Sequence, residues 1–133
     1  MLIANTYSGL GWFKFTWAAG KTVYPGADNQ ETTTAADGRA PAGKAVVLHR
    51  IITLFGCNGS AFTVADGAGV AYAGGNVFRN PSATGGATTI GDNQLTMLGI
   101  GNSTDLDLYL PNGLSITLAV GTGDAICVYA VLP

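Results

Sequence analysis

Residues 105–133 contain three apolar segments that alternate with a period of two and are separated by turns. In DLDLYL (105–110) and LSITLAV (114–120), aliphatic residues occupy every second position. AICVYAVLP (125–133) is apolar almost throughout, which is typical of a buried strand. The intervening PNG and GTGD sequences favour tight turns, because glycine tolerates positive φ and proline pre-sets a turn. This spacing predicts antiparallel β-structure.

The middle of the chain repeats the pattern. AVVLHRIITLF (45–55) is rich in β-branched residues and predicts a central strand. SAFTVAD (60–66) follows GCNG, so the two segments predict a hairpin. Shorter strands are predicted at 69–74, 76–79 and 94–100. Long helix-favouring segments are missing, and we predict an all-β sandwich or barrel whose core spans residues 45–133.

Residues 1–20 contain both tryptophans of the chain. On an extended strand, Trp12, Lys14 and Thr16 share one face, and the aromatic residues between and after them share the other. Two interpretations follow: an edge strand that packs on the core, or an arm that carries an aromatic anchor onto a neighbouring subunit. The candidate interface residues are Trp12, Phe13, Phe15, Trp17 and Tyr24.

Residues 21–44 are polar and rich in turn formers, and we predict a long loop, with room for a short strand at 31–34. The loop ends in GRAPAGK, which has the spacing G-x-x-x-x-G-K of a phosphate-binding loop. Such a loop needs a hydroxyl-bearing residue next and a helix after it. Ala45 and a β-branched segment stand there instead, so we interpret the motif as a loop-to-strand boundary and expect no nucleotide cofactor.

Other catalytic signals are weak. His49 is the only histidine, and on a regular strand it shares a face with Val47 and Ile51, which favours a core or interface histidine. Asp105 and Asp107 project from one strand face as a possible calcium or carboxylate pair, but a solvated polar face is the simpler interpretation. Asp66 and Asp124 lie in turn sequences. We therefore predict no enzyme activity, no metal ligands and no cofactor.

The charge pattern excludes some partners. Only 11% of the residues are charged, the net charge is -2, and the basic residues are scattered, so we expect no nucleic-acid binding. No apolar run reaches the roughly 20 residues of a membrane span. Met1 is followed by no basic n-region, and we expect assembly in a cytosol. So few charged residues predict that copies of this chain or a partner cover much of its surface. Cys57 and Cys127 are either two buried thiols, which we favour, or a disulfide.

LYLPNGLSITLAVGTGDAICVYAVLP, together with GKAVVLHRIITLFGCNGSAFTVAD, resembles small jelly-roll (TNF-like) virion proteins of tailed bacteriophages. The resemblance covers residues 43–75 and 105–133 and lies in the order of strands and turns. It implies a jelly-roll-like antiparallel β-sandwich. It also implies a capsid decoration or cement protein that binds the major capsid protein and stabilises the shell. Such proteins are commonly homotrimers on the virion surface, assembled in the host cytoplasm.

Two other functions stay open. A receptor- or glycan-binding head of a phage fibre would use exposed aromatic residues such as Trp12, Tyr72 or Tyr109 to stack on sugar rings. A shallow cleft with an exposed aromatic residue would favour it. A β-sandwich hydrolase would need His49, or the pair of aspartates in 105–110, in an open pocket.

Overall fold

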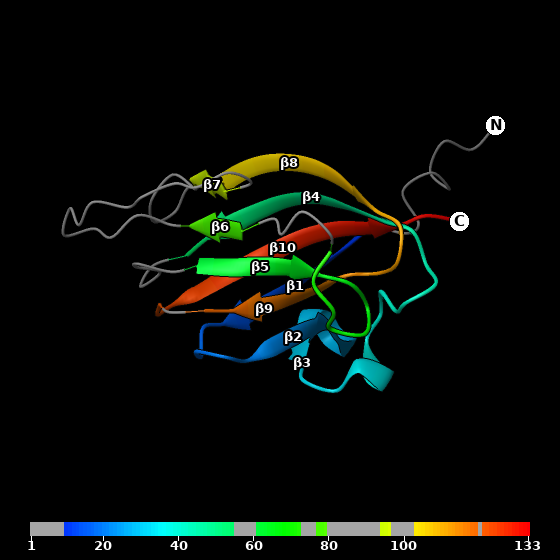
Figure 1. Cartoon of the computed structure of the whole chain (residues 1–133), viewed down its shortest axis with the longest axis horizontal. Helices are drawn as coiled ribbons and strands as arrows, with labels where there is room; N and C mark the ends of the chain where they lie inside the picture. Colours follow the sequence, from blue (N-terminus) through cyan, green and yellow to red (C-terminus); the bar gives the residue numbers. More distant parts are fainter. Residues whose placement is uncertain (1–9, 55–60, 73–76, 80–93, 97–102, 120) are drawn as a thin grey trace.

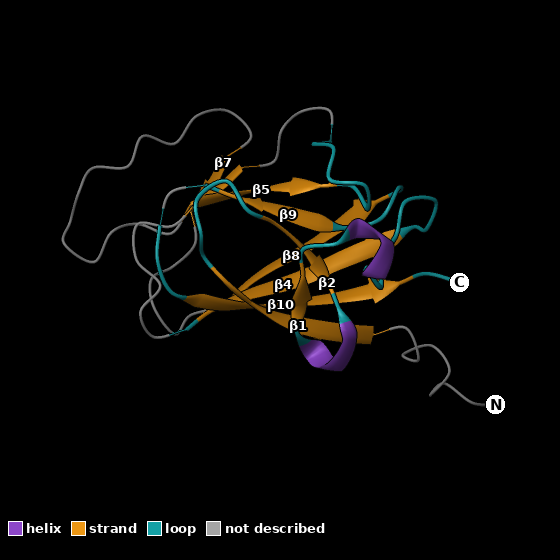
Figure 2. Ribbon diagram, turned by 90° about the horizontal axis from the view of Figure 1, so that it is seen from below, coloured by secondary structure: helices purple, strands orange, loops and turns teal. Residues whose placement is uncertain are grey.

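A computed structural model describes residues 10–54, 61–72, 77–79, 94–96, 103–119 and 121–133 of the chain. Two β-sheets stack face to face (Figures 1 and 2), so the predicted antiparallel β-sandwich is confirmed. Two short 3₁₀ turns, η2 (Ala27–Asn29) and η3 (Ala35–Asp37), are the helical segments of the described residues. No helix in this part of the chain is long and apolar enough to span a membrane.

The first sheet has four strands, and every neighbouring pair in it is antiparallel. Its order is β1 (Leu10–Thr16), β10 (Asp124–Val131), β4 (Val46–Thr53) and β8 (Ser103–Leu110). The second sheet has six strands, of which only the last pair is parallel. Its order is β3 (Glu31–Thr32), β2 (Thr22–Pro25), β9 (Ser115–Leu118), β5 (Ala61–Ala65), β6 (Val77–Arg79) and β7 (Gln94–Thr96). The chain crosses repeatedly from one sheet to the other (Figure 1).

The core lies between the sheets and is lined by alternate residues of each strand. β1 belongs to it: Phe13 and Phe15 are fully buried, and Trp17 just after the strand is 6% exposed. The ring of Phe15 lies 5.2 Å from that of Trp17 and 6.4 Å from that of Phe62 on β5, so these rings join the two sheets. Burying one such side chain contributes about 1.5–3 kcal/mol. β1 is therefore an edge strand packed on the core.

The segment 21–44 differs from the single long loop that its polar composition suggested. Val23 is fully buried and pairs with Ile116, so β2 is a strand of the six-stranded sheet. β3 falls within the short strand expected at 31–34, and a Lys21–Glu31 ion pair of 3.0 Å ties its start to the chain before β2. A strand of four residues that ends in proline has too little pattern to stand out among turn residues. The sandwich core thus extends N-terminally beyond 45–133.

The remaining strand predictions agree with the structure to different degrees. β4, β5, β8, β9 and β10 lie within or next to the predicted segments. β4 and β5 belong to different sheets, however, so the hairpin predicted for them is wrong. The strand expected at 69–74 is reduced, in its described part, to one bridge between Ala71 and Ala65. β6 and β7 are short pieces of the segments expected at 76–79 and 94–100.

Candidate functional site

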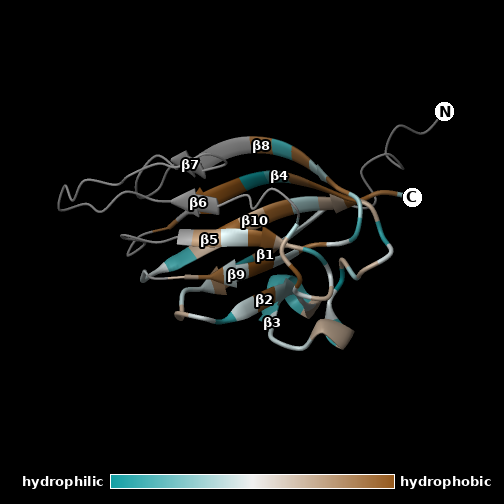
Figure 3. Cartoon of the chain, viewed as in Figure 1, coloured by the Kyte–Doolittle hydropathy of each residue, from teal (hydrophilic) through white to brown (hydrophobic). Residues whose placement is uncertain are grey.

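The outer face of the four-stranded sheet carries an apolar patch between charged residues, since Lys14 is the partner of Ile126 and Arg50 that of Val128. Cross-strand partners share a face, so Trp12 stands beside Val128, and Ile126 beside Ile52. Trp12 and Tyr109, at opposite edges of the sheet, are 44% and 63% exposed. We call this surface the apolar face; its residues are Trp12, Val47, Ile52, Tyr109, Ile126, Val128 and Ala130. In Figure 3 apolar colouring covers much of β4 and β10.

His49 interrupts the apolar face at a β-bulge. Leu48 is the partner of Leu108, but the next paired residue, Arg50, faces Asp105, so β8 carries one extra residue. Against β10, β4 itself carries one extra residue here, because Arg50 faces Val128 and Leu48 faces Tyr129. Ile51 therefore turns into the core, which corrects the expected strand face of His49. Asp107 has φ +48°, and its Oδ1 lies 2.9 Å from Nδ1 of His49.

This pair is open to solvent: the side chains of His49 and Asp107 are 40% and 72% exposed. An exposed pair of this kind contributes about 0–1 kcal/mol to stability. His49 is not a core histidine, and Asp107 is paired with it rather than with a second carboxylate. The side chain of Asp105 lies outside the described residues.

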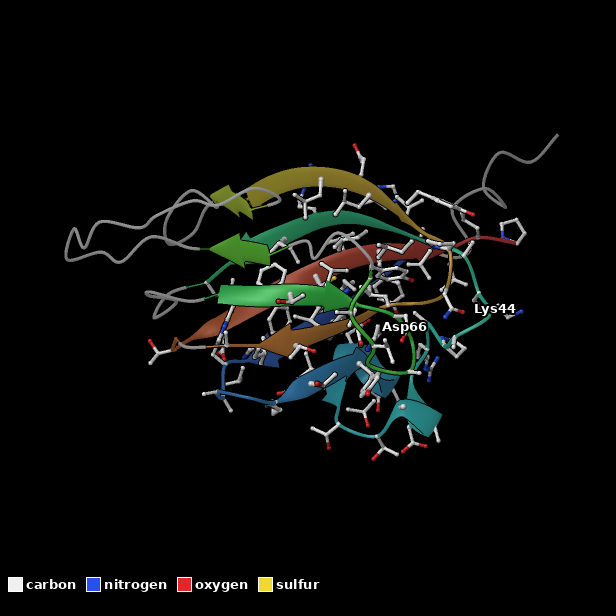
Figure 4. All side chains as sticks on the ribbon, viewed as in Figure 1. Lys44 and Asp66 are labelled. Carbon is white, nitrogen blue, oxygen red and sulfur yellow. The ribbon has the colours of Figure 1, made fainter. Side chains whose placement is uncertain are left out.

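The near-motif at 38–44 lies in a loop held by protein groups. The N–H of Gly43 donates to Oδ1 of Asn112 at 2.7 Å, and the strand β4 starts at Val46, where a phosphate loop would have a helix. Lys44 projects outward in Figure 4. Asp66 has the predicted turn role, since its Oδ1 accepts the N–H groups of residues 68 and 70 at 2.8 and 3.0 Å.

Four of the five candidate interface side chains are buried within the chain itself. Phe13, Phe15 and Trp17 belong to the core, and Tyr24 is 7% exposed. Tyr24 points away from the core but is covered by neighbouring loops: a Cβ on Gly69 would come within 2.7 Å of its hydroxyl, and one on Gly38 within 3.4 Å of its Cβ. Trp12 is the one of the five that solvent or a partner reaches.

A pocket of about 430 Å³ opens beside Trp12, at the free edge of β1. It forms because the chain at η2 runs alongside β1, where Lys14 and Gln30 make an isolated parallel bridge. Its walls come from β1, η2, the segment before β4 and the end of β10. The lining residues are Gly11, Trp12, Gly26, Asp28, Asn29, Arg39, Tyr129 and Val131. Trp12 thus lines a cleft, whereas Tyr72 and Tyr109 do not.

Backbone geometry shapes this pocket. Asp28 and Asn29 both have φ +58°, a left-handed conformation that these two residue types tolerate better than most. A Cβ on Gly26 would lie 2.7 Å from the carbonyl oxygen of Gln30, so only glycine fits this turn. A Cβ on Gly11 would lie 3.1 Å from the hydroxyl of Tyr129. Glycine at position 11 therefore leaves that phenol uncovered on the β1 side.

Tyr129 and Cys127 point inward from β10. Tyr129 is 6% exposed and packs edge-on to Phe13, with ring centroids 6.1 Å apart. Burial raises the pKa of the Tyr129 phenol, as does the nearby Cys127 thiol, and the positive charge of Arg39 lowers it. Burial also raises the pKa of Cys127, a free thiol. Cys57 lies outside the described residues.

Metal ligands do not gather in the described part of the chain: no group of three His, Cys, Asp or Glu side chains meets there. No sequence pattern indicates the pocket, because its residues come from four separate segments and each is ordinary by itself. No protein-family model matches this chain, and no curated protein or solved structure is significantly similar to it.

Proposed function

We propose that this chain is a structural virion protein of the capsid decoration or cement type, which binds the major capsid protein and stabilises the shell as a homo-oligomer. The strand order supports the proposal. β1, β10, β4 and β8 in one sheet face β2, β9, β5 and β6 in the other, an interleaving that supports a jelly roll. Jelly rolls are a common architecture of viral capsid domains.

The apolar face is the observation that carries the proposal. The outer face of an antiparallel sheet in a soluble monomer is normally polar. Here valines, isoleucines and an exposed tryptophan occupy much of it between Lys14 and Arg50, and only 11% of the whole chain is charged. Each Å² of apolar surface removed from water contributes about 25 cal/mol. A capsid surface or a neighbouring copy that covers this face would gain that free energy on assembly.

Two measurements test the proposal. Light scattering at micromolar concentration is expected to give an oligomer, with a trimer as the expected state; a clean monomer would count against self-assembly. Co-sedimentation with capsids of the parent virus that lack this protein is expected to return it to the particles and to raise their melting temperature. Protein that stays in the supernatant, or binds without stabilising the shell, contradicts a cement role.

A further inference from the structure

Tyr129 presents a polar atom that the fold leaves without a partner. The residue is 6% exposed, and among the described residues its hydroxyl makes no hydrogen bond. The hydroxyl is not among the closed-off polar atoms of the described residues, so it is open to solvent and to a ligand. Tyr129 lines the pocket beside Trp12, with its hydroxyl on the side of Gly11. A ligand in the pocket would therefore supply the hydrogen bond that the protein does not.

The other polar side chains that line the pocket also lack hydrogen-bond partners among the described residues. The side chains of Asp28, Asn29 and Arg39 make no hydrogen bond or ion pair within the described ranges. A carboxylate only accepts hydrogen bonds, a guanidinium only donates them, and an amide or a phenol does both. The pocket thus offers donors and acceptors in a mixed set, with one negative and one positive charge that balance.

The apolar wall is a single large surface. Trp12, which is 44% exposed, and Val131 are the apolar side chains among its lining residues. An aromatic face of this kind packs well against C–H groups while its surroundings stay wet. The volume of about 430 Å³ is within the roughly 300–1,000 Å³ of small-molecule sites.

We propose that this pocket binds a neutral saccharide of one or two sugar rings. A pyranose ring has an apolar C–H face for Trp12 and a rim of hydroxyls that both donate and accept. Asp28 and Arg39 would pair with adjacent hydroxyls, and the phenol of Tyr129 would bind a hydroxyl at the pocket floor. A purely anionic ligand would meet the carboxylate of Asp28, and a cationic one the guanidinium of Arg39.

The site belongs to one copy of the chain and does not depend on the proposed virion function. Trp12 is shared with the apolar face, so substitutions of Trp12 do not separate the two proposals. Tyr129 and Asp28 lie outside that face and do separate them. Failure of assembly leaves the saccharide site testable on the same protein, and failure of saccharide binding leaves assembly intact.

The test is titration of the full chain with methyl glycosides of glucose, galactose, mannose and N-acetylglucosamine, and with maltose and lactose, to about 10 mM, where a site with a Kd of about 1 mM is filled. Saturation-transfer NMR reports binding. The indole N–H signal of Trp12 is expected to shift, while that of Trp17, which is 6% exposed, serves as the internal reference.

Substitutions locate the site. Tyr129→Phe removes only the hydroxyl and is expected to weaken binding roughly tenfold without changing the melting temperature or the oligomeric state. Asp28→Asn keeps a residue that tolerates positive φ and is expected to weaken binding similarly. Tyr109→Phe removes an exposed phenol across the sheet and is the matched control, with unchanged affinity.

Three outcomes overturn the proposal. The first is that no saccharide shifts the Trp12 signal. The second is that a saccharide binds equally well to the native chain, Tyr129→Phe and Asp28→Asn. The third is that glucuronate, included as a charged comparison, binds more tightly than every neutral sugar, because the two opposite charges in the walls predict a neutral ligand.

Discussion

The outer faces of the two sheets differ in the side chains of their central rows. On the four-stranded sheet, the central rows hold Val128 beside Trp12 and Ile126 beside Ile52. On the six-stranded sheet, the corresponding positions are threonines: Thr22, Thr117 and Thr63 stand side by side on β2, β9 and β5. Threonine and valine are nearly the same size and both favour strands. The proposed contact of the four-stranded sheet with another molecule would account for this difference.

The largest expected effect comes from placing one charge on each face. Ile126→Glu puts a carboxylate beside Lys14, so the subunit itself is expected to fold, but the charge must be buried when the apolar face is covered. We expect association to weaken by about 100-fold or more, measured by light scattering over a dilution series. Thr117→Glu on the six-stranded sheet is the control and should assemble normally. Equal effects of the two substitutions would remove the distinction between the faces.

The loss of stability at high pH tests whether the titrating groups lie on the inner side of β10 and not on its apolar outer side. Burial raises the pKa of both Cys127 and Tyr129 above their ordinary values of 9.0 and 10.0. The folded state thus holds protons that the unfolded state releases. Their contribution to stability is complete below pH about 9 and is lost as the pH rises further, by about 1.4 kcal/mol per pH unit for each group.

Urea unfolding between pH 8 and 11 checks this expectation, and Cys127→Val should shift the onset of the loss upward by about one pH unit. Dissociation that clearly precedes unfolding in the same range would mean that a titrating group lies in the interface, contrary to an apolar contact.

The bulge that interrupts the apolar face gives a smaller effect. Asp107 has φ +48°, where most residues are strained by about 1–2 kcal/mol and asparagine much less. We expect Asp107→Ala to lower the free energy of unfolding by about 1 kcal/mol and Asp107→Asn to lower it by less than about 0.5 kcal/mol. Urea unfolding at neutral pH measures both. If the asparagine variant is as unstable as the alanine variant, the ion pair with His49 carries the stability and the backbone does not.

A reciprocal exchange of valine and threonine gives the smallest effect. Oγ1 of Thr117 lies 3.2 Å from Oγ1 of Thr22 on a half-buried surface, so Thr117→Val should change stability by less than about 1 kcal/mol and leave association unchanged. Val128→Thr, the opposite exchange on the apolar face, is expected to weaken association several-fold. Analytical ultracentrifugation resolves such differences. A stronger effect at Thr117 than at Val128 would mean that the six-stranded sheet, and not the apolar face, makes the contact.

Sequence pattern predicted the elements in which alternation is unbroken. Phe13 and Phe15 point inward and Trp12 and Lys14 outward, as the period of two indicates, and β8 to β10 lie where their turns place them. The register past His49 was not predictable, because it depends on irregular pairing of β4 with both of its neighbours, β10 and β8. The pattern also left the role of the N-terminal segment open, because its aromatic residues fit an arm as well as a strand packed on the core.

The pocket could not be predicted for a different reason. Its polar residues, Asp28, Asn29 and Arg39, lie in a turn-rich stretch where such residues are common. Tyr129 looks like one more strand aromatic until Gly11, its cross-strand partner, is known. The site exists only through pairing of strands at opposite ends of the chain, which no local window contains.

The place of β10 in the middle of its sheet governs how the protein is made. β10 joins β1 to β4, and Leu10 has Ala130 as its partner. During translation the aromatic residues of β1 leave the ribosome long before the strand on which they align. Contacts so distant along the chain form slowly. A chain that stops before residue 124 exposes two unpaired strand edges and is a substrate for proteases or a seed for aggregation. Completion of the last strand thus decides whether the new chain is kept or destroyed.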